Sequence, residues 1–116
     1  MKKVIATLTA LTILAGTAAQ AQNIEGAVKA RQGVMGVLGI NLGILGGMAK
    51  GAIPYDADAA MAAANSVLGV AMIDPKPLFP EGSDEMDSAT SRAKAEVWEG
   101  WDKFNSEWAG LKTAAE

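Results

Sequence analysis

The sequence has 116 residues, 50% of them hydrophobic and 5% aromatic, which is the length of one domain and leaves no room for a second. It contains neither cysteine nor histidine, which excludes disulfides, thiolate or imidazole metal sites, and catalytic pairs built on those side chains. The net charge of −3 provides no basic surface, so we expect no nucleic-acid partner.

Residues 1–21 have the pattern of a bacterial export signal. "MKK" is a basic start, "VIATLTALTILAGTA" is an apolar core, and "AQA" at 19–21 places small residues where a signal peptidase reads. A retained membrane anchor is the alternative, and the shortness of the apolar run disfavours it. The sequence therefore predicts a mature periplasmic chain of residues 22–116. Removing Lys2 and Lys3 from the 10 basic residues leaves 8 against 13 acidic ones, a net charge of −5.

Residues 24–49 are predicted to form one long helix, because apolar residues recur along one line at alternating steps of four and three. The line comprises Ile24, Val28, Met35, Leu38, Leu42 and Leu45. Arg31 falls on the same line, where a guanidinium is costly unless its charge is met or reaches water. Two interpretations stay open: Arg31 reaches water or pairs with Glu25 or Glu96, or the seam opens around a ligand with an apolar body and acidic edges.

The same helix carries glycines at every fourth position, a flat strip that lets another backbone approach closely. They are Gly39, Gly43 and Gly47, and Gly51 continues the same spacing just beyond the predicted helix end. Val34, Val37, Ile44 and Met48 form a second apolar face, typical of a central helix or one shared with another subunit. Residues 32–49 carry no charge, but they are marginal in length for a transmembrane helix and contain Asn41, so we expect no membrane span.

Two further helices are predicted. Pro54 ends the first helix region, and Asp56 can cap a helix over 56–73. The buried face predicted for this second helix is Met61, Ala64, Leu68 and Met72, with Ala71 as the alternative to Met72. Residues 74–88 contain three prolines and a glycine and are predicted to be a loop, with Leu78 and Phe79 folded back on the helices.

A third helix is predicted over 90–115. It has one apolar face, flanked by Trp98, and the residues of that face are Ala93, Val97, Trp101, Phe104, Trp108 and Leu111.

Four segments occur in an order and spacing that resemble the cytochrome c′ family: "VKARQGVM", "MAKGAIPYDA", "LFPEG" and "SRAKAEVWEGWDKF". The resemblance covers residues 24–112. It implies an all-α fold, an antiparallel four-helix bundle of which three helices are present. It also implies a periplasmic protein that is not an enzyme and that binds haem c for electron transfer or for binding small gases such as nitric oxide. The partners implied are a second copy of the chain, through the first two helices, and a small redox partner or gas ligand.

The resemblance also implies which residues meet the cofactor. Arg31 and Gln32 match residues that face the haem and its propionates, and Met35 matches the apolar group on the distal face. Ser91, Arg92 and Ala93 match the segment before the tryptophan motif, which touches haem as well.

The sequence departs from the family at the fourth helix, whose Cys-x-x-Cys-His links the haem and supplies the axial histidine. Without these residues the chain has no metal ligand of its own, and we expect it to be C-terminally incomplete and unable to attach haem covalently. Two alternatives remain. One is a haem-free helical interaction or dimerisation protein of the periplasm, and the other is a membrane-embedded glycine-zipper helix at 33–53.

Overall fold

The computed structural model describes residues 4–116, so residues 1–3, the basic start of the predicted export signal, lie outside the described residues. The described chain is helical and has no strand, which confirms the all-α fold. Its elements are α1 (Val4–Ala49), α2 (Ala57–Ala71), the 3-10 turn η1 (Lys76–Leu78), α3 (Glu96–Glu99) and α4 (Trp101–Ala115).

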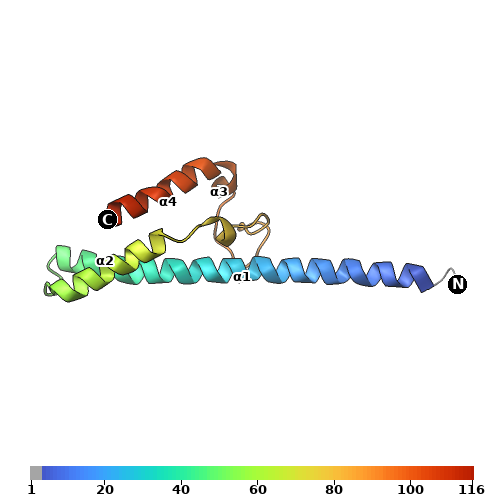
Figure 1. The fold of residues 1–116 in the computed structure, drawn as a ribbon, viewed down its shortest axis with the longest axis horizontal. Coiled ribbons are helices and arrows are strands. Elements are labelled where there is room, and N and C mark those ends of the chain that lie inside the picture. The colour runs from blue at the N-terminus through green and yellow to red at the C-terminus, as the bar shows by residue number, and fades with distance from the viewer. Residues whose placement is uncertain (1–3) are drawn as a thin grey trace.

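Helix α1 is 46 residues long and starts twenty residues before the predicted Ile24, because the apolar segment assigned to the export signal is also helical. Its first part, blue in Figure 1, extends away from the other helices, and the molecule is 77 Å long as a result. Among the residues whose side chains the structure describes, the Asn23–Ala49 part of α1 is the one segment that is long and apolar enough to cross a membrane. In this fold, however, α2 and η1 pack along α1.

The end of α1 at Ala49 agrees with the prediction and follows from Gly51. This glycine has a φ of 71°, a conformation that other residues rarely adopt, and it lets the chain fold back on the helix. The Gly51 N–H donates to the Met48 carbonyl at 3.1 Å, and the Ala52 N–H donates to the Gly47 carbonyl at 2.9 Å. This pair of bonds is a Schellman cap, which satisfies carbonyls at the end of the helix.

Helix α2 begins as predicted but buries a different face. The Asp56 carboxylate accepts a hydrogen bond from the Ala59 N–H at 2.7 Å and caps the helix. The predicted face was wrong at Met61 and Met72, which are 63% and 68% exposed. Ala64 and Leu68 are half-buried, and Ala71, the alternative to Met72, is buried. The buried residues are Ala63, Val67, Val70 and Ala71. They form an equally regular stripe of smaller side chains, and these allow α2 to lie close to both of its neighbours.

The third predicted helix is shorter than 90–115 and is divided in two. Residues 91–94 are not helical, because the Ala93 carbonyl accepts a hydrogen bond from the Glu85 N–H at 2.8 Å, which holds the chain in a loop. Gly100, with φ −115° and ψ 41°, separates α3 from α4. Ala93 was wrongly assigned to the apolar face of this helix, because it lies in the 91–94 segment. The rest of the predicted face is right: Trp108 is buried, and Val97, Trp101, Phe104 and Leu111 are half-buried.

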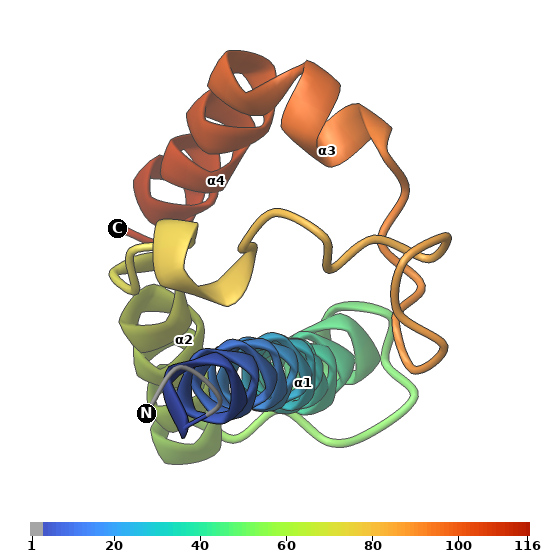
Figure 2. The same ribbon diagram turned by 90° about the vertical axis from the view of Figure 1, so that its right-hand side faces the viewer.

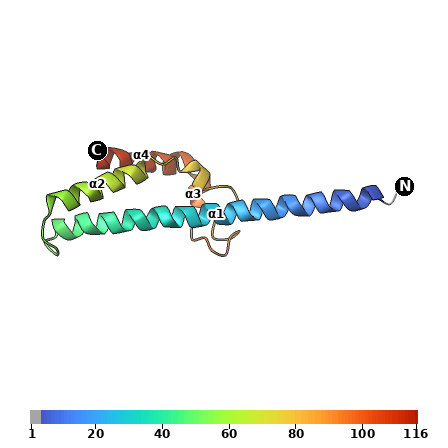
Figure 3. The same cartoon turned by 60° about the horizontal axis from the view of Figure 1, so that its bottom comes forward.

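The three long helices alternate in direction, as Figures 1 and 3 show, with α2 running back along α1 and α4 running back along α2. Viewed along α1, α2 lies beside it and α4 lies above α2 (Figure 2). Among the described elements, α2 is the one that contacts both α1 and α4. An apolar hollow of about 180 Å³ separates α1 from α4, and it is lined by Leu42, Leu45, Ala64, Val67, Leu111, Ala114 and Ala115. The helices thus occupy three positions of an antiparallel four-helix bundle.

The buried stripe of α2 can be tested by truncating one side chain on each face. Val67→Ala should lower the free energy of unfolding by about 2 kcal/mol, because it removes two buried methyl groups. Met61→Ala should change it by less than about 0.5 kcal/mol, since that side chain is in water. Urea unfolding followed by circular dichroism measures both values, and equal losses for the two variants would contradict the observed face.

Candidate functional site

Arg31 is buried at the centre of the molecule, with 5% of its surface exposed. Its Nη1 donates to the Leu78 carbonyl at 3.1 Å and to Ser83 Oγ at 2.8 Å. Its Nη2 donates to the Ser83 carbonyl and, at 2.6 Å, to Ser91 Oγ. Four of the five N–H donors of the guanidinium are therefore taken by oxygens of one loop, residues 78–93.

The chain tolerates an arginine on an apolar seam because hydrogen bonds to four oxygen atoms satisfy its buried guanidinium. All four of these acceptors are uncharged. Neither expected carboxylate pairs with Arg31: Glu25 bonds Lys29 at 2.9 Å, and Glu96 is not among its partners. The guanidinium also makes cation–π contacts: its Cζ atom lies 4.9 Å from the centroid of the Phe79 ring and 5.9 Å from that of the Trp98 ring. Burial lowers the pKa of Arg31, but an arginine stays protonated at neutral pH.

The 78–93 loop is ordered by its own bonds as well as by Arg31. Asp84 accepts from the backbone N–H groups of Met86 and Asp87 at 2.8 and 2.9 Å, an Asx turn. Gly82 adopts a φ of 75° and so turns the chain in front of Ser83. Ser83 is fully buried. The turn places its hydroxyl and its carbonyl oxygen where both accept hydrogen bonds from the guanidinium of Arg31.

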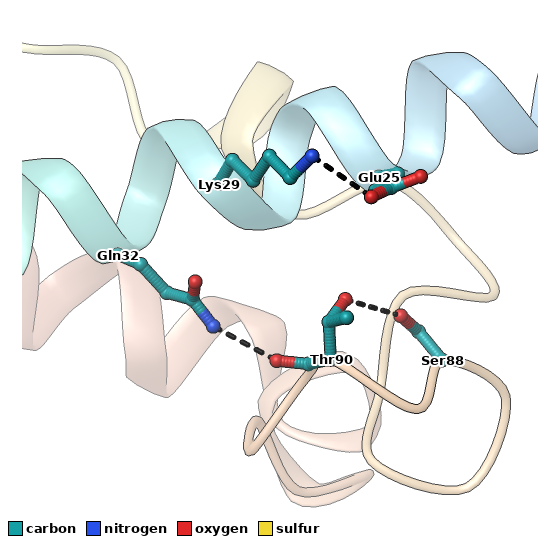
Figure 4. A network of polar contacts seen from close by, with 5 residues as sticks. All are labelled: Glu25, Lys29, Gln32, Ser88 and Thr90. Atoms are coloured by element: carbon teal, nitrogen blue, oxygen red, sulfur yellow. Dashed lines mark hydrogen bonds and ion pairs between the residues drawn. The ribbon is translucent and has the colours of Figure 1, made fainter.

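A second side chain of α1, that of Gln32, also bonds the 78–93 loop. Figure 4 shows the Gln32 side chain pointing from α1 to the loop, where Nε2 donates to the Thr90 carbonyl at 2.8 Å. The Thr90 and Ser88 hydroxyls are 3.3 Å apart and share a hydrogen bond. Lys29 and Glu25 pair along the exposed side of the helix, and the hydrogen bond from Lys29 lowers the pKa of Glu25. Arg31 and Gln32 together fasten the loop to α1.

A hollow of about 290 Å³, here named the Arg31 hollow, opens where α1 meets this loop. It is lined by Arg31, Gln32, Met35, Phe79, Arg92 and Ala93. The structure therefore brings five of the six predicted site residues to one hollow. The sixth, Ser91, lies behind it and accepts from Arg31. The sequence analysis did not identify Ser83 as a site residue, because no pattern marks it apart from the "LFPEG" segment directly before it. It predicted that Phe79 folds back on the helices, but not that Phe79 lines the site.

Phe79 separates the Arg31 hollow from a second one, of about 310 Å³, which is lined by Lys76, Phe79, Glu81, Trp98 and Trp101. Its ring makes an edge contact with Trp98 at 6.1 Å and with Phe104 at 4.8 Å between centroids. The indole N–H of Trp98 donates to the Phe79 carbonyl at 3.0 Å, and that of Trp108 donates to the Ile73 carbonyl at 2.9 Å. Both indole N–H groups are satisfied, in half-buried Trp98 and in buried Trp108, so this cluster forms an apolar wall.

The chemistry of the Arg31 hollow is that of binding. Two arginines and an amide line it together with Met35, Phe79 and Ala93, and no acidic side chain does. Such a lining suits a ligand with an apolar body and an anionic edge. Within the part of the chain whose side chains are described, no group of three or more histidine, cysteine, aspartate or glutamate side chains is placed to hold a metal ion.

Comparison with known proteins gives a consistent result. Residues 26–116 match the family model described as cytochrome C′. The chain is 36% identical to a cytochrome c-554 of Cereibacter sphaeroides over 105 residues, which are 90% of this chain and 69% of that protein. It is 36% identical to a cytochrome c′ of the same species over 107 residues, 91% of this chain and 70% of the relative.

A solved structure is similar as well. It is a cytochrome c′ from Rhodobacter spheriodes, with a TM-score of 0.76 and 33% sequence identity. The match covers 80% of this chain and 72% of that one. A cytochrome c-556 of Agrobacterium fabrum is 34% identical over 110 residues, 95% of this chain and 72% of the relative.

The role of Arg31 in holding the loop can be tested through stability. Arg31→Met should lower the free energy of unfolding by about 3 kcal/mol, because it removes four hydrogen bonds and leaves buried oxygens without their donor. Lys29→Met, an exposed cation half a turn earlier, should change it by less than about 0.5 kcal/mol. Urea unfolding followed by tryptophan fluorescence measures both, and an Arg31→Met variant as stable as Lys29→Met would show that the bonds contribute nothing.

Proposed function

Because this chain belongs to the cytochrome c′ family, we propose that it binds haem in the Arg31 hollow and serves in electron transfer or in binding a small gas such as nitric oxide. The observation that carries the proposal is the lining of that hollow, where an apolar surface meets two cations. The proposed function is electron transfer or gas binding and not catalysis, which is what membership of the cytochrome c′ family implies.

The residues proposed to hold the haem are Arg31, Gln32, Met35, Ser91, Arg92 and Ala93. Haem is a flat apolar macrocycle with two carboxylates on one edge, which is the chemistry that this lining suits. When bound, its iron supplies the redox couple and a coordination position that a gas can occupy. The protein supplies apolar contacts from Met35 and Ala93, a fixed wall at Phe79, and cationic donors for the carboxylates.

The family implies haem c, and the sequence limits how the haem can be held. A c-type haem is linked through cysteine thiols and has an axial histidine. Residues 1–116 contain neither residue type, so these residues alone can hold haem only without a covalent bond.

We propose that residues 1–21 direct export and that residues 22–116 act in the bacterial periplasm. The support is the basic, apolar and small-residue order of the segment. The absence of cysteine means that an oxidising compartment would add no disulfide to this chain.

We also propose that the chain dimerises through the outer face of α1 together with α2. Large apolar side chains of α1 are exposed there, with Ile40 at 68% and Val37 at 48%. No atom approaches within 4 Å of the Cβ position at Gly39 or Gly43, so this part of the glycine strip is open to a partner, whereas the Ile53 side chain covers Gly47 at 3.2 Å. Because residues 32–49 carry no charge, this surface can face its own copy without like-charge repulsion.

Haem binding by these residues can be tested by titration. Ferric haem added to the purified chain should give a shifted Soret band that saturates at one haem per chain. After expression with a c-type haem maturation system, acidified butanone should remove all haem from the protein, because no thiol is present to retain it. An unchanged Soret band would refute haem binding. Haem that stays with the protein through extraction would refute the non-covalent mode.

Dimerisation through α1 can be tested with a charge on its exposed apolar face. Ile40→Glu should shift the protein from dimer to monomer in sedimentation velocity, because two buried carboxylates would face each other across the axis. Met86→Glu is the control, since Met86 is exposed on the loop and lies outside this face. A chain that sediments as a monomer before mutation, or that needs detergent for extraction, would contradict the proposed dimer.

A further inference from the structure

We infer that Arg92, and not Arg31, is the cation that contacts the anionic edge of a ligand in the Arg31 hollow, and that Arg31 is a positioning residue that holds the loop carrying Arg92. The inference rests on the proposed haem function and divides the roles of the two arginines that line the hollow.

Arg31 has almost no donor left for a ligand. Its two terminal nitrogens carry four N–H groups, and each nitrogen already donates to two oxygens of the loop. Ser83 is held in place from the other side, because its hydroxyl also donates to the Pro80 carbonyl at 2.6 Å. For Arg31 to bind a carboxylate, these buried oxygens would have to lose a charged donor, which is unfavourable.

Arg92 is in the opposite situation. Its side chain is exposed and lines the hollow, and within the described residues it makes no hydrogen bond or ion pair. All five guanidinium N–H donors are therefore available, in a fork that matches a carboxylate.

The backbone that carries Arg92 is fixed on both sides. Ser91 accepts the hydrogen bond from Arg31, and the same hydroxyl oxygen accepts from the Ala93 N–H at 3.1 Å. The Ala93 carbonyl accepts from the Glu85 N–H at 2.8 Å. Arg31 thus acts on the hollow through Ser91, and it determines the position of the backbone from which the Arg92 side chain extends.

The test compares two probes that differ only at the anionic edge: ferric haem and its dimethyl ester. The original chain should bind haem about tenfold more tightly than the diester, by Soret titration. Arg92→Ala should reduce that preference about fivefold, and Arg92→Lys should restore part of it because the charge returns without the fork. Lys94→Ala, which removes an exposed cation two residues away, is the control and should keep the preference.

Variants of the Arg31 contacts should behave differently. Arg31→Lys and Ser83→Ala should speed amide hydrogen exchange in residues 82–93 of the ligand-free protein about tenfold, while Arg92→Ala leaves it unchanged. Both should weaken haem and diester binding together and so preserve the ratio. If Arg31 were instead the contacting cation, Ser83→Ala would free one of its donors and raise the preference for haem.

The outcomes separate this inference from the function on which it rests. If neither probe binds the original chain, the proposed haem function fails, and the assignment of Arg92 fails with it. If haem binds but Arg92→Ala keeps the full preference, the haem function stands and the assignment to Arg92 is wrong. If exchange in residues 82–93 is the same in Arg31→Lys as in the original chain, the positioning role of Arg31 is wrong regardless of ligand.

Discussion

The burial of a guanidinium without a counter-ion is the constraint on which the rest of this structure depends. Arg31 is 5% exposed, and its partners are two backbone carbonyls and two serine hydroxyls. Each hydrogen bond to a charged donor is stronger than a neutral one, but the desolvation cost of a cation is large. The loop must therefore stay closed around Arg31, since opening it would remove these acceptors at once. For this reason a segment with little regular structure keeps one conformation.

The second constraint is that the described helices leave one side of the bundle open. Helix α2 packs on both neighbours, whereas α1 and α4 are separated by an apolar hollow. The tryptophan-rich face of α4 is accordingly half-buried along most of its length, and Trp108 is the residue of that helix that is fully packed. Apolar side chains that are only partly removed from water contribute only part of their transfer free energy. The Arg31 contacts thus have a larger share in holding the molecule together than they would in a closed bundle.

Sequence patterns predicted the parts of this structure that depend on local chemistry. The helix end at Ala49, the Asp56 cap and the inward Phe79 each follow from residues within a few positions. The pattern failed where two solutions were equally regular, as on α2, where a stripe of valine and alanine is buried in place of the methionines. It also failed where partners are distant in sequence. Ser83 and Ser91 lie 52 and 60 residues from Arg31, and no periodicity marks a serine as an acceptor for a buried cation. The common location of Arg31, Gln32, Met35, Arg92 and Ala93 came from the family resemblance.

Hydrogen bonding to neutral oxygens satisfies the donors of Arg31 but does not cancel its charge. The positive field of Arg31 still reaches the hollow that it lines with Arg92, and no acidic side chain lines that hollow to oppose it. In a partly dehydrated site such a field favours an anion without any direct contact. One arginine can therefore attract the ligand and order the loop while the other makes the bond. Because the loop is ordered by bonds within the protein, its conformational entropy is lost on folding and not on binding, which is the physical meaning of a preorganised site.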